Sequence, residues 1–139
     1  MAETWFGYRL VSLMRQPAQL GRRLPSAAVA GVWIYHGFWC KVAGRCPDQL
    51  GVIEDLPGMP RRLAKPALVG LGVLEIALAT WVISGRMPRK AAITQTVLLA
   101  VMNGGGLAWS RRHIRAPRAL VAENVAFLAL LWWAAHNDS

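Results

Sequence analysis

The apolar stretch from Pro66 to Gly85 constrains the fold of this chain more than any other feature. Its residues, PALVGLGVLEIALATWVISG, carry a single charge, that of Glu75 near the middle. A helix of about 20 residues rises about 30 Å, which matches the hydrocarbon core of a bilayer. A lone carboxylate at the centre of such a helix costs roughly 2.5–3.5 kcal/mol on insertion scales, so it needs an inward-facing partner or a function. The first question is therefore what Glu75 contacts.

The composition and the distribution of charge indicate one membrane domain. The chain has 139 residues, of which 55% are hydrophobic and only 17% are charged. A soluble domain of this length would carry more charge. The basic residues give a formal charge of +9 and lie between the apolar blocks, at their ends and near the N-terminus. Because no nucleic-acid-binding motif accompanies them, we expect the lipid bilayer and not nucleic acid as their partner.

The hydropathy pattern predicts an all-α fold, a four-transmembrane-helix bundle with an N-terminal amphipathic interfacial helix. Residues 1–23 are expected to form a basic amphipathic interfacial segment, with a helix at Thr4–Arg15 and a basic linker through Arg22 and Arg23. A disordered tail or docking onto a partner protein is the alternative. Residues 24–139 are expected to form the transmembrane domain. Its spans are predicted at about 25–44, 66–85, 91–109 and 119–135. Lys and Arg are too evenly divided between the two faces to predict the orientation.

Polar side chains of the predicted spans gather in one half of the bilayer. Measured from the side of the first and third loops, Glu75 is roughly 13 Å deep and His36 roughly 12 Å deep, at 1.5 Å per residue. The other polar residues in this half are Lys41, Asn103, Glu123 and Asn124. The opposite half has mainly uncharged polar residues. This asymmetry predicts a polar pocket that opens to one side, or a closed network between the helices.

Glu75 has two candidate partners, Lys41 and His36. A Lys–Glu pair would offset much of the burial cost of each group, and the loss of one partner would leave an unpaired buried charge. Two interpretations of the cluster are open. The polar groups either only hold the helices together, or they form a site for a quinone-like or other small ligand or a proton relay. The common depth of these residues depends on the predicted ends of the spans, and if those ends are wrong the residues do not form a cluster.

The two cysteines, Cys40 and Cys46, lie at the end of the first predicted span and in the loop after it. A disulfide would require that this loop face an oxidising compartment, and we expect two free thiols. His36 and Cys40 share a helical face, but two ligands are too few for a metal site. His136 lies at a different depth from His36, so no haem site is expected. No nucleophile elbow, phosphate loop or zinc-protease pattern predicts a catalytic residue.

Two motifs resemble those of the DoxX-like membrane proteins: WxxxGxxxK at residues 33–41 and GxGxxE at residues 70–75. The resemblance extends over roughly residues 24–135. It includes a Pro-rich first loop, an Asn in the third span, and a Pro followed by Glu-Asn at the start of the fourth span. The residues of this chain that match the pattern of the family are Trp33, Gly37, Lys41, Glu75, Asn103 and Asn124. This chain departs from the family pattern in two respects. The family often has a basic residue where this chain has Glu123, and the basic N-terminal segment is an addition to the family pattern.

The resemblance implies a compact four-helix membrane bundle. Some members of this family are named for a quinone-linked thiosulfate oxidation system, and others accompany redox or detoxification enzymes as membrane partners. Because no catalytic constellation is present, we expect a non-catalytic integral-membrane subunit that docks onto other subunits of a larger redox or electron-transfer complex. The alternative is a quinone-linked membrane oxidoreductase component with a polar pocket around Glu75, which would hold a quinone or a lipid. We expect this protein in the bacterial inner (cytoplasmic) membrane.

Overall fold

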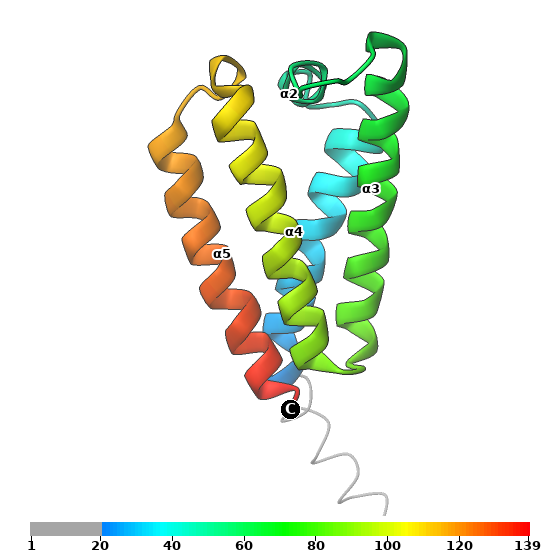
Figure 1. Cartoon of the computed structure of the whole chain (residues 1–139). Coiled ribbons are helices and arrows are strands. Elements are labelled where there is room, and N and C mark those ends of the chain that lie inside the picture. The colour runs from blue at the N-terminus through cyan, green and yellow to red at the C-terminus, as the bar shows by residue number, and fades with distance from the viewer. Residues whose placement is uncertain (1–20) are drawn as a thin grey trace, which may run out of the picture.

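The computed structural model describes residues 21–139, and every element of this part of the chain is helical (Figure 1). The predicted all-α fold is therefore confirmed. Residues 21–34 are α-helical and continue directly into a π-helix, so residues 21–42 form one rod. The predicted interfacial helix, Thr4–Arg15, lies outside the described residues, and residues 21–23, predicted as a linker, belong to the helix of this rod. The elements that follow residue 34 are η1 (Tyr35–Val42), α2 (Asp48–Glu54), α3 (Arg61–Ser84), α4 (Pro88–Trp109), η2 (Arg111–His113) and α5 (Pro117–Asn137).

Three helices, α3, α4 and α5, are long and apolar enough to cross a membrane. Each of them begins a few residues before the predicted span. Helix α3 begins at Arg61 and contains Pro66 in its second turn, where the proline has no N–H to donate to the carbonyl of Arg62. It ends at Gly85, whose φ of 66° is the left-handed conformation that glycine adopts without strain. Helices α4 and α5 both begin with a proline at the first turn.

The rod of residues 21–42 lies beside α3, and the backbones of the two elements touch at a pair of glycines (Figure 1). A Cβ atom added at Gly37 would lie 2.6 Å from the carbonyl oxygen of Gly72, and one added at Gly72 would lie 2.6 Å from the oxygen of Gly37. Small residues permit such close approach of helices in lipid. The contact places the next turn of the rod, which carries Lys41, directly against the turn of α3 that carries Glu75.

One end of the bundle is closely packed. Here Arg23 donates to the carbonyl of Ile83 at 2.9 Å, and Ser26 donates to the carboxylate of Asp138. Further in, Trp33 is buried and its Nε1 donates to Oε1 of Gln95 at 2.7 Å. The apolar core at this end and in the middle consists of Val29, Ala30, Trp33, Leu78, Ala79, Val82, Ala92, Leu99, Leu131, Ala134 and Ala135.

The opposite end of the bundle is covered by α2, which lies far from the C-terminus in Figure 1. We call α2 the cap. It is attached to the segment after α4, because Ser110 donates from Oγ to the carbonyl of Val52 at 2.7 Å. The guanidinium of Arg112 pairs with Asp55 at the end of the cap, and Nε donates to Oδ2 at 2.6 Å. The cap therefore covers the space between the helices at this end.

Candidate ligand-binding site

A cavity of about 760 Å³ lies beneath the cap, between the rod and helices α3, α4 and α5. Such a volume is within the range of about 300–1,000 Å³ that is typical of small-molecule sites. Apolar side chains form most of the wall. All six residues of the predicted polar cluster also line it: His36, Lys41, Glu75, Asn103, Glu123 and Asn124. The structure thus brings the six residues together around one space, and their role in binding stays a prediction.

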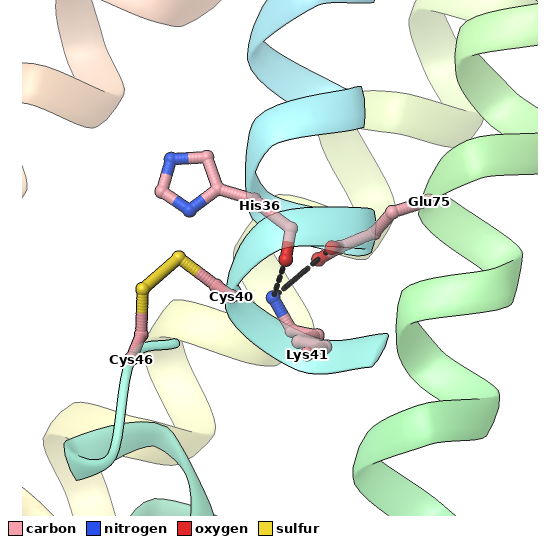
Figure 2. The surroundings of a disulfide bond; sticks show 5 residues. All are labelled: His36, Cys40, Lys41, Cys46 and Glu75. Carbon is pink, nitrogen blue, oxygen red and sulfur yellow. Dashed lines mark hydrogen bonds and ion pairs between the residues drawn. A yellow bond between two sulfur atoms is a disulfide. The ribbon is translucent and has the colours of Figure 1, made fainter. Parts of the chain in front are cut away.

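Lys41 is the partner of Glu75. The ammonium Nζ donates to Oε2 of Glu75 at 3.0 Å and lies 2.9 Å from Oε1 (Figure 2). The two side chains are only 5% and 0% exposed, so this ion pair is removed from water. Oε1 makes no well-aligned hydrogen bond among the described residues despite its short distance to Nζ. Because the two charges cancel, the pair adds polarity to the cavity wall without adding net charge.

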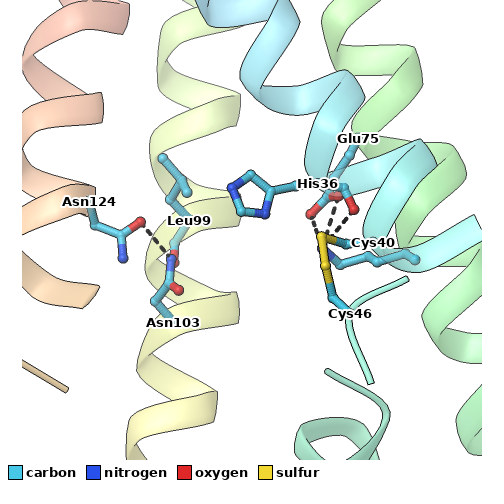
Figure 3. Close-up of polar contacts among 8 residues, drawn as sticks. His36, Cys40, Cys46, Glu75, Leu99, Asn103 and Asn124 are labelled. Carbon is cyan, nitrogen blue, oxygen red and sulfur yellow. Dashed lines mark hydrogen bonds and ion pairs between the residues drawn. A yellow bond between two sulfur atoms is a disulfide. The ribbon is translucent and has the colours of Figure 1, made fainter. Parts of the chain in front are cut away.

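His36 points away from this ion pair. Figure 3 shows its imidazole projecting from η1 toward Leu99 and Asn103 of α4, while Glu75 lies on the other side. Neither the His36 ring nor the carboxylate of Glu123 makes a hydrogen bond or ion pair with another described residue, and both line the cavity. These two titratable groups, on η1 and α5, are therefore available to a molecule in the cavity.

Asn103 and Asn124 join α4 to α5 across the cavity wall. Nδ2 of Asn103 donates to Oδ1 of Asn124 at 3.1 Å and to the carbonyl of Leu99 at 3.0 Å (Figure 3). Nδ2 of Asn124 donates to the carbonyl of Leu120 at 2.8 Å. An amide nitrogen has two N–H groups, so Asn124 keeps one donor without a partner among the described residues.

The two cysteines form a disulfide, and the expectation of two free thiols is wrong. Cys40 lies on η1, and Cys46 lies just before the cap (Figure 2). The chain turns back between them at Gly44, whose φ of 67° is left-handed, and this brings the two Cα atoms to 4.6 Å. Sequence spacing alone does not reveal such a turn, which explains the error.

Sequence reasoning also missed the contribution of the cap. Gln49, Val52 and Ile53 of the cap line the cavity together with Leu56 just after it. Their i, i+3, i+4, i+7 spacing is the signal that could have identified this face. Nearby, the ring of His113 lies over Gly51, where a Cβ atom would be 2.5 Å from it.

The link between the cap and η2 is electrostatic as well. His113 Nε2 lies 3.2 Å from Oδ2 of Asp55, and Arg115 lies 3.5 Å from Asp48. The hydrogen bonds from Arg112 hold the pKa of Asp55 below its ordinary value, and Asp55 in turn raises the pKa of Arg112. The cap is therefore fastened at both ends, by a disulfide and by ion pairs.

A comparison of the sequence with known families matches residues 30–132 to the DoxX-like family. The chain belongs to the DoxX-like family. The match confirms the resemblance found in the sequence motifs, and it covers the cavity residues, the disulfide and the cap. Comparison with curated proteins and comparison with solved structures each find no match.

The geometry of this DoxX-like protein gives a physical reason for its two motifs. Gly37 of WxxxGxxxK and Gly72, the second glycine of GxGxxE, are the residues at which the backbones of the rod and α3 touch. The lysine and glutamate that end these motifs are the buried ion pair. Among the described residues no group of three or more His, Cys, Asp or Glu could hold a metal ion. What these residues can offer a ligand is hydrogen bonds and proton transfer.

Proposed function

We propose that this DoxX-like membrane protein binds a quinone-like ring compound in the cavity beneath the cap. The observation that carries the proposal is the cavity of about 760 Å³ whose apolar wall contains the six polar residues. A quinone is a flat, largely apolar ring with two opposed carbonyl acceptors. His36 on η1 and Asn124 on α5 present N–H donors from two walls of the cavity. Apolar walls with a few convergent polar groups are the usual composition of such sites.

The proposal counts the rod of residues 21–42 as a fourth span. It lies beside α3, and its exposed side chains include Ile34, Tyr35, Phe38 and Trp39. These apolar and aromatic side chains suit lipid contact, with the aromatic rings near a headgroup region. A ligand that dissolves in lipid could then reach the cavity from the membrane.

Docking onto a larger redox complex stays a prediction. The described helices expose many large apolar side chains, but lipid accounts for them as well as a partner protein would. The same holds for the interfacial role of residues 1–23, and for the bacterial inner membrane as the location.

Quinone binding can be tested with the purified full chain in lipid nanodiscs, because Trp33 and Trp109 line the cavity and report on its occupant. We expect saturable quenching of tryptophan fluorescence by decylubiquinone. The variants His36→Leu and Asn124→Leu should each weaken binding about fivefold, since the loss of a hydrogen bond to a buried carbonyl costs on the order of 1 kcal/mol.

The matched control is Val125→Ala, because Val125 neighbours Asn124 on α5 but is 61% exposed and outside the cavity lining. Its affinity should equal that of the unmodified chain. Quenching that rises linearly with quinone, or that falls equally in all three variants, would exclude a specific site in the cavity.

A further inference from the structure

We propose that the cavity binds the reduced, dihydroxy form of the ring, a quinol, more tightly than the quinone, and that Glu123 selects this form by accepting a hydrogen bond from one hydroxyl group. This inference rests on the proposed function. It adds the redox form of the ligand and a residue that discriminates between the two forms. Its basis is the set of hydrogen-bonding groups in the cavity wall that have no partner among the described residues.

Three acidic side chains of the described residues line the cavity, and two of them are paired with basic side chains. Oε1 of Glu75 lies 2.9 Å from Nζ of Lys41, and Oδ2 of Asp48 lies 3.5 Å from Nε of Arg115. Glu123 is the third, and its carboxylate has no hydrogen bond or ion pair within residues 21–139. Of these three acidic groups, Glu123 is therefore the one that a ligand meets unpaired.

The position of Glu123 on α5 directs its side chain to the cavity. Leu120 and Phe127 also line the cavity, and they lie three residues before and four residues after Glu123, on the same face of the helix. The carboxylate thus lies between two apolar side chains of the wall. An ionised group within a transmembrane helix is costly when it has no partner. A ligand that donates a hydrogen bond to Glu123 would offset this cost.

A quinone and a quinol differ in the hydrogen bonds that their two oxygens make. The oxygens of a quinone are carbonyl groups and only accept, whereas each hydroxyl group of a quinol donates one hydrogen bond and also accepts. An ionised carboxylate only accepts. A quinone oxygen beside Glu123 would therefore place two acceptors against each other. A quinol hydroxyl group in the same place forms a charge-assisted hydrogen bond, which is stronger than a neutral one.

Other groups of the cavity wall also suit a hydroxyl group. Gln49 of the cap lines the cavity, and its Oε1 is buried and accepts no hydrogen bond from another described residue. A buried acceptor of this kind is destabilising until a donor reaches it. A neutral imidazole has one donor and one acceptor nitrogen, so His36 can bind a hydroxyl group as well as a carbonyl group. The free N–H of Asn124 can donate to either. A quinol therefore keeps the donors available to the quinone and adds hydrogen bonds to the acceptors.

The two forms can be compared by competition, with the full chain in nanodiscs under anaerobic conditions. Saturable quenching of tryptophan fluorescence by decylubiquinone is measured first. Decylubiquinol is then added, and its own emission is subtracted with empty nanodiscs. Because a quinol is a poor electron acceptor, its binding should restore the emission that the quinone quenches. We expect the quinol to bind at least about tenfold more tightly than the quinone, since hydrogen bonds to charged groups are the stronger ones.

The variant Glu123→Gln tests the residue assignment, because it keeps the size of the side chain and removes its charge. The quinol preference should fall about tenfold, so that the two forms bind about equally. Glu123→Ala, which removes the acceptor without adding a donor, should lose the preference as well. The matched control is Glu54→Gln, since Glu54 lies on the cap but outside the cavity lining. It should keep the preference of the unmodified chain.

A quinol that binds no more tightly than the quinone to the unmodified chain would overturn this inference, whatever the variants do. A quinol preference that persists in Glu123→Gln and Glu123→Ala would overturn the role of Glu123. Both results leave the proposed function intact, because saturable quenching by the quinone is established before the quinol is added. A chain that binds neither form saturably would overturn both proposals.

Discussion

At the scale of single residues, the buried ion pair of Lys41 and Glu75 is the contact whose loss should cost most. Changing Glu75→Gln leaves an ammonium without a counter-charge at a site that is at most 5% exposed. Breaking a buried pair in this way typically costs about 3–5 kcal/mol. We expect a lower midpoint of thermal unfolding in detergent for Glu75→Gln, and recovery of most of the loss in the double variant Lys41→Met/Glu75→Gln.

The matched control for this prediction is Glu123→Gln. It makes the same chemical change in the same cavity, but Glu123 has no ion pair with another described residue. Its unfolding midpoint should stay close to that of the unmodified chain. Equal shifts for the two glutamine variants would show that the pair with Lys41 does not stabilise the bundle.

A second prediction at this scale concerns pH. Because the partner Arg112 lowers the pKa of Asp55, the pair stabilises the folded cap above the ordinary carboxylate pKa of about 3.9 and loses this effect as the pH falls through the lowered value. The protection factors of the cap amides in hydrogen exchange, which are corrected for the intrinsic exchange rate, should therefore fall below about pH 4. In Arg112→Gln the protection should be lower already at neutral pH and should fall less on acidification, because the stabilising pair is absent throughout. Arg111→Gln, at an exposed position without an ion pair to another described residue, should behave as the unmodified chain. Identical pH profiles for both variants would contradict it.

At the scale of elements, hydropathy and length predicted α3, α4 and α5 well, because a bilayer requires long apolar helices. A polar residue within an apolar span can be recognised from the sequence, and its depth in the membrane follows from its distance to the end of the span. All six polar residues of the cluster could therefore be assigned to one half of the bundle. The sequence does not reveal whether such residues leave a space between them, since that depends on how the side chains pack. The π-helix was missed too, because its geometry reflects tertiary contacts rather than local propensity.

The glycine contact between the rod and α3 offers the sharpest test at this scale. In Gly72→Ala the new Cβ would lie 2.6 Å from a backbone oxygen that cannot move aside. Overpacking of this kind costs about 1–3 kcal/mol, so the unfolding midpoint should fall and the Lys41–Glu75 pair should separate. Gly70→Ala is the matched control, because a Cβ at Gly70 would meet nothing within 4 Å. A similar loss of stability in both variants would show that helix propensity and not the close contact is responsible.

At the scale of the whole molecule, the disulfide indicates the orientation of the protein in the membrane, which the distribution of Lys and Arg does not. Disulfides persist in oxidising compartments, and the bridge lies at the end of the bundle that carries the cap and η2. The turn between α3 and α4 lies at the opposite end, near the C-terminus (Figure 1). The cap and the cavity beneath it are therefore expected to face the non-cytoplasmic side.

Single cysteines test this orientation in a background that carries Cys40→Ser and Cys46→Ser. Arg111→Cys places a thiol in η2 at the capped end, and Arg89→Cys places one in the first turn of α4, next to the turn between α3 and α4. Both positions are exposed, so labelling reports the side of the membrane and not burial. A membrane-impermeant maleimide should label the first variant in intact cells and the second only after permeabilisation. The opposite pattern would place the disulfide in a reducing compartment, where a persistent bridge is not expected.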